Sequence, residues 1–343
     1  MRTPAKCTAA VVAAVLAGGT VAGAPAARAA SGCQWAPATL PVPEGYRLER
    51  VGTGDGAGAV TGTLRPKSPG EPLIGVVWRA DGLQVPGAAF GLDTELTDVN
   101  ASGVAVGSYT DPREFGQFPL NHAVRYTGGR FERLPDPPGY ANTKALAINA
   151  RGDILGAAGE TAASGVGPSI VWPADAPGTV EVLPVPSAGW QVQGGIDDDG
   201  TVAAAVLAGP GFTGYVLPRS GPAIPLASPV PDGDVVPTAI KAQRIAGYAG
   251  DAGAFLWHLD GSVDRALPGL RNVAAMNSAG AVVGYADGGT TLFLPPDGGP
   301  AQVVAPAGQN ARASELAENG DVFGTATVSA PDPVPAAVRW HCG

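Results

Sequence analysis

A unit of about 45 residues recurs seven times along this chain of 343 residues. Its marker is a tight turn followed by a short apolar strand, and successive markers end between 37 and 49 residues apart. The seven markers end at Gly62, Gly107, Gly156, Ala204, Gly247, Gly284 and Gly324. Repeats of this length built from short strands are typical of β-propellers. The repeat therefore predicts an all-β fold, a seven-bladed β-propeller.

Each unit also carries signals for four strands. The marker turn joins the first strand to the second, and a short apolar run that ends in an aromatic residue or Leu, such as Gly75–Trp78, marks the third. The fourth closes on Pro, as at Leu134-Pro135, and Pro is confined to sheet edges and strand ends. The fourth strand should therefore be the outermost one, in blades of four strands.

The two ends of the chain complement each other. The last unit stops at Trp340-His341-Cys342-Gly343, before its fourth strand, and the segment Ala38–Pro41 carries the missing strand signal. Pairing the two removes an otherwise open sheet edge. We therefore expect the N-terminal strand to close the ring.

Residues 1–29 have the pattern of a secretory signal peptide. Arg2 and Lys6 precede the apolar run Thr8–Ala24, and Ala27-Arg28-Ala29 is a small-residue cleavage site. Residues 30–343 then form the propeller domain. No other stretch is long and apolar enough to anchor the chain, so we expect a secreted, extracellular protein without membrane insertion.

Two cysteines remain after removal of the signal peptide, Cys33 and Cys342, one near each end. An even pair in an exported protein predicts a disulfide between them. The alternative is that Ala30-Ser31-Gly32-Cys33 is a lipoprotein cleavage box, which would leave Cys342 alone.

The net charge of −9 excludes one class of partner. Binding to nucleic acid requires clustered Lys and Arg to neutralise phosphates, and the chain has no such cluster. We expect no nucleic-acid partner, and the charge favours solubility.

The marker motif, Ile-Asn-x-x-Gly-x-Val-x-Gly, and the strand-three motifs resemble the extracellular HAF-repeat family over most of residues 46–340. The tripeptide that names the family is split here between His122-Ala123-Val124 and Ala254-Phe255-Leu256-Trp257, and its usual Asp-Leu-Gly is absent. The resemblance implies a secreted repeat protein and carries over no catalytic residue.

The sequence has no clear motif for a catalytic, metal-binding or nucleotide-binding site. Gly54–Gly58 and Asp197–Gly200 sit where other units have their hairpin turn, so we interpret them as turns rather than as a phosphate loop or a calcium loop. His122, His258 and His341 lie in different units, without metal-ligand spacing. The sequence predicts no catalytic residues, no metal site and no cofactor.

Loop length points to one face of the propeller. The loops between strands two and three, Thr63–Leu73, Ser108–Asn121 and Ala157–Pro168, are longer than the hairpin turns opposite them. Binding residues concentrate in long loops on rigid scaffolds. The aromatic candidates for ligand binding on this side are Tyr46, Phe90, Phe115, Phe118, Tyr140 and Trp190. The alternative is that these rings wedge adjacent blades together.

The sequence favours a non-enzymatic binding module that recognises an extracellular carbohydrate or protein through this face, and we expect a monomer. One alternative is a polysaccharide lyase or hydrolase, which would need two or more acidic or His side chains at the propeller channel. The strand-one residues Ala145, Ala147, Ala239 and Ala275 argue against that. A structural envelope or matrix component is the other alternative.

Overall fold

The computed structural model describes residues 34–113, 119–159, 167–186, 191–231, 233–299, 301–305, 309–328 and 334–343. The chain divides into Met1–Gly32 and the compact unit Cys33–Gly343. The predicted signal peptide and Cys33 lie outside the described residues. No helix in the described part of the chain has the length and apolar character needed to cross a membrane.

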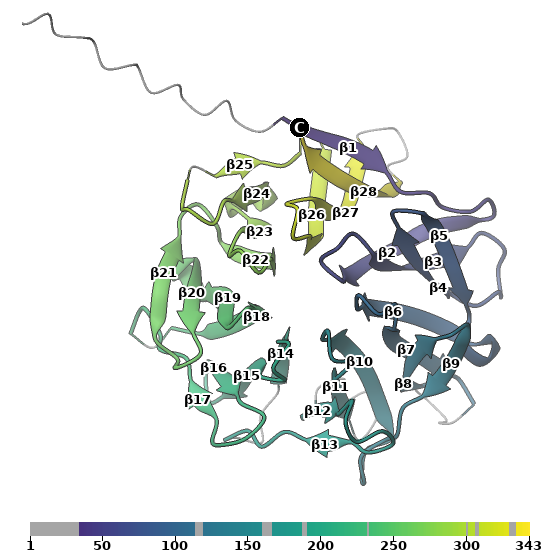
Figure 1. The fold of residues 1–343 in the computed structure, drawn as a ribbon, viewed down its shortest axis with the longest axis horizontal. Helices are drawn as coiled ribbons and strands as arrows, with labels where there is room; N and C mark the ends of the chain where they lie inside the picture. The colour runs from purple at the N-terminus through teal and green to yellow at the C-terminus, as the bar shows by residue number, and fades with distance from the viewer. Residues whose placement is uncertain are drawn as a thin grey trace, which may run out of the picture. The chain divides into compact units, whose positions relative to one another are not determined.

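Seven four-stranded antiparallel sheets form the blades of a propeller, as predicted (Figure 1). Each blade starts at the centre of the ring with the strand that precedes the marker turn. These innermost strands are β2 (Tyr46–Gly54), β6 (Asp93–Val99), β10 (Asn142–Ile148), β14 (Gln191–Ile196), β18 (Val235–Lys241), β22 (Asn272–Met276) and β26 (Gln309–Leu316).

The second strand of each blade carries the apolar part of the marker. These strands are β3 (Val60–Pro66), β7 (Ala105–Asp111), β11 (Ile154–Gly159), β15 (Val202–Ala208), β19 (Arg244–Ala249), β23 (Val282–Tyr285) and β27 (Val322–Val328). The third strands are β4 (Ile74–Arg79), β8 (Leu120–Thr127), β12 (Ser169–Trp172), β16 (Gly211–Leu217), β20 (Ala254–His258), β24 (Thr291–Leu294) and β28 (Pro335–Cys342). The second and third strands are largely apolar because the neighbouring blades cover them.

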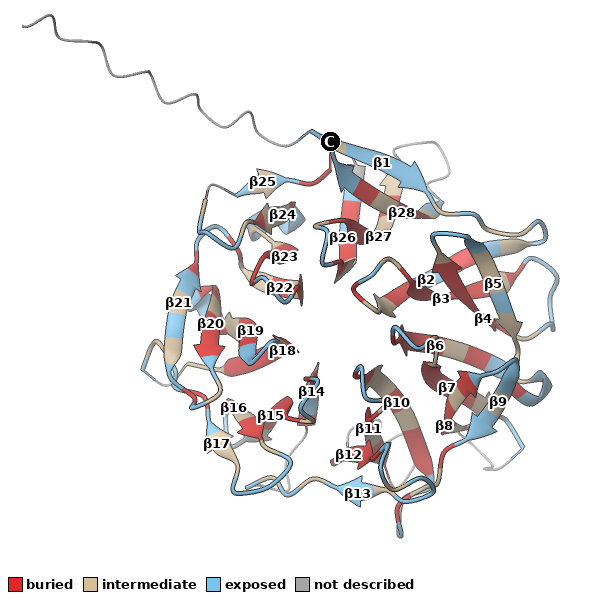
Figure 2. Ribbon diagram, in the orientation of Figure 1, coloured by how far each residue is buried: buried red, intermediate tan, exposed pale blue. Residues whose placement is uncertain are grey.

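The outermost strands are the most exposed (Figure 2). They are β5 (Gly82–Gly87), β9 (Arg130–Arg133), β13 (Glu181–Val182), β17 (Ile224–Pro225), β21 (Val263–Leu267), β25 (Gln302–Val303) and β1 (Trp35–Thr39). The prediction that strand four is outermost is confirmed. In blade 4 this strand ends earlier than the predicted Ser228-Pro229.

The N-terminal strand closes the ring. β1 pairs antiparallel with β28, from Trp35 opposite Cys342 to Thr39 opposite Val338. Closure therefore uses a strand that begins a few residues before the predicted Ala38–Pro41, and Cys342 is the last residue of β28. Because Trp35 lies two residues after Cys33, this register is consistent with the predicted Cys33–Cys342 bond, which stays a prediction.

Every innermost strand contains a register shift directly after the residue that faces the end of the marker, which is Gly in six blades and Ala204 in blade 4. In blade 2, Leu96 pairs with Gly107 and Asp98 pairs with Val106, so Thr97 bulges from the ladder. The bulge draws the two backbones together: a Cβ on Gly107 would lie 1.9 Å from the carbonyl oxygen of Glu95. The marker ends in Gly because no side chain fits at this approach.

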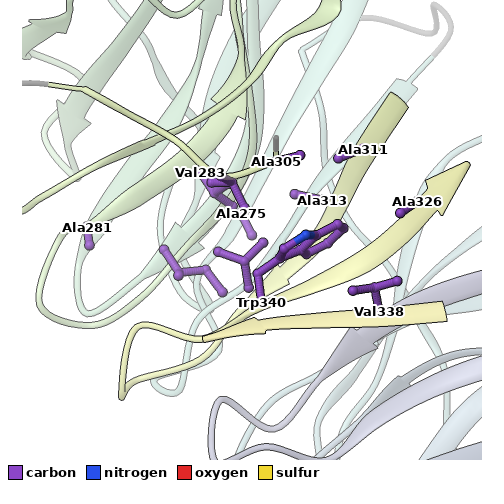
Figure 3. Packing of buried hydrophobic residues seen from close by; sticks show 12 residues of the cluster. Ala275, Ala281, Val283, Ala305, Ala311, Ala313, Ala326, Val338 and Trp340 are labelled. Atoms are coloured by element: carbon purple, nitrogen blue, oxygen red, sulfur yellow. The ribbon is translucent and has the colours of Figure 1, made fainter. Parts of the chain in front are cut away.

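Indole rings join the blades at their outer parts. The Trp at the end of strand three donates its Nε1–H to a carbonyl oxygen at the end of the preceding blade's outermost strand. The N···O distances are 2.7 Å for Trp78 and Pro41, 2.8 Å for Trp172 and Pro135, and 2.9 Å for Trp257 and Ala227. Trp340 packs against small side chains of β22, β23 and β26 (Figure 3), but its buried Nε1–H has no hydrogen-bond partner among the described residues.

Candidate functional site

The described ligand-binding candidates lie at equivalent places in three consecutive blades. Tyr46 is the first residue of the innermost strand β2, and Phe90 and Tyr140 lie in the joints that lead into β6 and β10. Because the strands of a blade alternate in direction, these joints and the loops between strands two and three emerge on one side of the ring, the long-loop face. Phe115, Phe118 and Trp190 lie outside the described residues.

Tyr46 and Tyr140 follow the same turn. In each case the Tyr N–H donates to a Pro carbonyl three residues earlier, at 3.2 Å from Pro43 and 3.0 Å from Pro137. The Gly before each Tyr has a φ near +85°, which a type II turn requires and which Gly adopts at little cost. Both rings are half-buried against the hydrophobic residues of a blade joint. They therefore have a wedging role as well as an accessible edge.

Phe90 differs from the two tyrosines. Its ring is 58% exposed and its backbone lies in the left-handed region, at φ +55°, which costs a non-Gly residue about 1 kcal/mol. The ring meets Tyr109 edge-on at 5.1 Å between centroids, and Tyr109 in turn contacts the buried His122. His122 thus belongs to the packing within blade 2.

A pocket of about 630 Å³ opens on the long-loop face where the last blade meets the first. One wall is the segment Thr39–Val42 that leads out of β1, and another is Val334–Ala337 at the start of β28. Tyr46, Arg47 and Lys67 complete the lining from blade 1. We call it the seam pocket. Its volume is typical of small-molecule and peptide-side-chain sites, and it contains one of the predicted ligand-binding residues.

The charged residues of the seam pocket are basic. Arg47 and Lys67 are both exposed, and none of the described residues forms an ion pair with either. Arg65, which lies opposite Arg47 on β3, is engaged by Glu49 through two hydrogen bonds of 2.7 and 2.8 Å. This bidentate pair holds the pKa of Glu49 below its usual value. Within the described residues, Arg47 and Lys67 thus have no ion-pair partner, although the charge of Arg47 also helps to lower the pKa of Glu49.

Two acidic side chains on innermost strands form the second candidate site, which the sequence analysis missed. Asp98 on β6 and Glu315 on β26 occupy the same position of their strands, the first position beyond the bulge. Asp98 Oδ2 accepts a hydrogen bond from the N–H of Ile148 in the next blade at 2.8 Å. Glu315 Oε2 accepts one from the N–H of Gly54, again in the next blade, at 3.2 Å.

Burial perturbs both acids. It raises the pKa of Asp98 to about 7, although hydrogen bonds from Ile148, Thr53 and Val99 and the charge of Lys241 act in the opposite direction. Burial also raises the pKa of Glu315 to about 8, with a further increase from the charge of Asp98. Glu315 keeps part of its surface accessible, whereas Asp98 is 6% exposed. Acidic side chains with shifted pKa values on the strands nearest the propeller axis are what the enzyme alternative requires.

The acids could have been found in the sequence. The marker copies that contain Asn begin with Asp98, Ala147 and Ala275, and the last copy begins with Glu315. An acidic residue at a position that is Ala in blades 3, 5 and 6 and Gly in blade 4 is therefore a visible exception.

The opposite side of the ring, the turn face, is occupied by links between blades. Asn100 donates its side-chain N–H to the carbonyl oxygen of Asn149 at 3.1 Å, and Asn149 donates to the carbonyl of Asp197 at 3.0 Å. Asp197 then accepts hydrogen bonds from the backbone N–H groups of Ala242 and Gln243. The Asp197–Gly200 run is thus a turn, as interpreted, and its first carboxylate joins blade 4 to blade 5.

The other sequence motifs are structural as well. In the turn Gly54–Gly58, Asp55 Oδ1 accepts hydrogen bonds from the N–H groups of Ala57 and Ala59. Within the described ranges, no three His, Cys, Asp or Glu side chains are grouped so that they could hold a metal ion.

Comparison with known proteins supports the fold alone. No family model matches the chain, and no curated protein matches it. Among solved structures, the β-propeller domain of the Trilobed protease from Pyrococcus furiosus superimposes with a TM-score of 0.60 at 10% identity, over 87% of this chain and 96% of that one. A puromycin-hydrolyzing peptidase from Mycobacterium tuberculosis gives a TM-score of 0.57 at 14% identity, over 88% of this chain and 53% of the peptidase. A puromycin hydrolase gives 0.55 at 15% identity, over 88% and 54%.

Proposed function

We propose that this protein is a secreted binding module that holds an extracellular ligand on its long-loop face, in the seam pocket. The observation that carries the proposal is the pocket itself, about 630 Å³ in volume and lined by Tyr46, Arg47 and Lys67. The contrast between the two faces supports it. At the turn face, the side chains of Asn100 and Asn149 form hydrogen bonds between blades, whereas no described residue forms an ion pair with the two cations of the seam pocket.

Binding arrays test the function. The mature protein is applied to an immobilised peptide array and to an oligosaccharide array, and we expect retention on one of them. Tyr46→Ala should reduce retention at least severalfold, since stacking on one aromatic ring is worth on the order of 1 kcal/mol. Tyr140→Ala is the matched control, because it removes the same ring from the same kind of turn at another joint. Equal losses in the two variants, or loss only with Tyr140→Ala, would contradict the assignment to the seam pocket.

Export is tested separately. The protein recovered from the medium should have lost residues 1–29 and begin at Ala30, which intact-mass measurement detects. Retention of Met1 in exported protein, or a lipid on Cys33, would contradict the signal-peptide assignment.

The second candidate function is polysaccharide cleavage at the propeller axis. Asp98 and Glu315 favour it, because both lie on innermost strands and have raised pKa values. It ranks below binding because each carboxylate accepts a backbone hydrogen bond from the adjoining blade. Release of new reducing ends from a polysaccharide panel, abolished by Glu315→Gln in a folded protein, would make catalysis the function.

A further inference from the structure

We propose that the seam pocket recognises a peptide segment that presents a carboxylate beside an apolar side chain, in its simplest form the C-terminal end of a polypeptide. The inference rests on the proposed binding function and adds the chemical class of the ligand. It is derived from three properties of the pocket: its apolar walls, its pair of cations and the strand edge beside it.

The walls of the pocket are apolar. Leu40, Pro41 and Val42 form one side, and Val334 and Pro335 form part of the other. Val334 is 63% exposed, which makes it one of the most exposed large apolar side chains among the described residues. A ligand that covers these walls gains from burial of apolar surface on both partners. An apolar side chain of a peptide meets that requirement.

The cations determine the charge of the ligand. Arg47 and Lys67 line the pocket without a described ion-pair partner, while the adjacent Arg65 is already paired with Glu49. No acidic residue belongs to the described lining. A carboxylate placed between the two cations accepts charge-assisted hydrogen bonds, and the Arg guanidinium can bind it through two parallel bonds. The pocket therefore favours an anionic group next to an apolar one.

The strand edge favours a peptide over a sugar chain. β1 is the outermost strand of its sheet, and its last residue, Thr39, lines the pocket. A peptide can hydrogen-bond to such an edge through its backbone while alternate side chains enter pockets. An acidic oligosaccharide would instead need several aromatic platforms and neutral polar groups, and the described lining offers one of each, Tyr46 and Thr39.

Two synthetic tetrapeptides of one sequence, acetyl-Ala-Pro-Val-Leu, test the proposal by isothermal titration calorimetry. One has a free C-terminal carboxylate and the other a C-terminal amide. We expect the free acid to bind at least tenfold more tightly, which corresponds to about 1.4 kcal/mol. Its affinity should fall as salt rises, whereas that of the amide should not.

Two variants assign the effect to the pocket. Arg47→Ala combined with Lys67→Ala should lower the affinity for the free acid to that of the amide and leave the amide unchanged. Both side chains are exposed, so the fold should persist, and thermal melting checks this. Arg130→Ala is the matched control, because it removes an exposed cation from the outer hairpin of blade 2. It should change neither affinity.

Two outcomes would overturn the peptide assignment. Equal affinity of acid and amide would remove the carboxylate from recognition. Binding of trigalacturonate through Arg47 and Lys67, with no binding of either peptide, would replace the peptide by an acidic oligosaccharide and leave the binding function standing. The proposed function fails separately, when neither array retains the protein.

Discussion

Replacing the marker glycine of blade 2 by alanine tests the physical basis of the repeat. In Gly107→Ala, the new Cβ would lie 1.9 Å from the carbonyl oxygen of Glu95 and 2.9 Å from the Cα of Leu96. Real Cβ atoms essentially never approach another heavy atom closer than 3.0 Å. The strand β7 must therefore move away from β6 by about 1 Å, against the hydrogen bonds of the ladder on either side.

The expected cost follows from overpacking. Forcing one methyl group into a packed interior costs about 1–3 kcal/mol, and the loss of glycine entropy in the unfolded chain returns about 0.4–1 kcal/mol. We expect Gly107→Ala to lower the free energy of unfolding by about 1–2 kcal/mol. In a domain of this size the melting temperature falls by about 2–4 °C for each kcal/mol.

Blade 4 provides the control, because it already has Ala204 where the other blades have Gly. Ala204 lies opposite Gln193, next to the bulge at Gly194-Gly195. Ala204→Gly creates no close contact; it should cost the entropy of a glycine in a strand, about 0.5–1 kcal/mol, and the burial of one methyl group, about 0.8 kcal/mol. Urea unfolding followed by tryptophan fluorescence measures both variants. A Gly107→Ala protein as stable as wild type would refute the argument that the bulge requires glycine.

Three further predictions concern the acids, the cysteines and the indole links. The raised pKa values of Asp98 and Glu315 mean that the folded chain binds more protons than the unfolded chain. The stability due to these two acids is therefore complete below about pH 4 and is lost as the pH rises through about 7 to 8. Asp98→Asn should flatten this decline of the free energy of unfolding in urea, and an unchanged pH profile would contradict the raised pKa of Asp98. The exported protein should show no free thiol before reduction, and two titratable thiols would rule the bond out. Cys33→Ser should lower the melting temperature, since the Cys33–Cys342 bond contributes at most about 5 kcal/mol to the free energy of unfolding. Trp172→Phe, which keeps a ring but loses the hydrogen bond to Pro135, should cost about 1 kcal/mol in calorimetric unfolding, and a loss of several kcal/mol would show that packing rather than the hydrogen bond dominates.

The reason for the marker Asn became clear only in the structure. The sequence suggests that Asn is chosen for its tolerance of left-handed backbone angles. In blade 2 it is Gly103 that has the positive φ, of +78°, while Asn100 accepts hydrogen bonds from Ser102 and Val104 within its own turn. The same side chain donates to Asn149 in the next blade. A contact between blades is invisible in a single repeat.

The two candidate sites differ in how far the sequence could predict them. Asp98 and Glu315 begin their marker copies, so their shared position is readable, but the repeat does not reveal that the bulge turns both toward the backbone of the next blade. The sequence predicts Tyr46 as an aromatic residue on the long-loop side. Its pocket was not predicted, because Val334 and Leu40 lie at opposite ends of the chain and meet only through the pairing of β1 with β28.

The sequence by itself determined the number of blades, the order of the strands and the closure of the ring. These features depend on local signals, the turn, the apolar alternation and the strand-ending Pro, and repetition makes each of them readable several times over. Tertiary structure alone decided which polar groups are used up between blades and which remain for a ligand. That depends on which side chains the fold places together. Arg47 and Arg65 have the same chemistry, but among the described residues only Arg65 has a carboxylate, that of Glu49, within hydrogen-bonding distance.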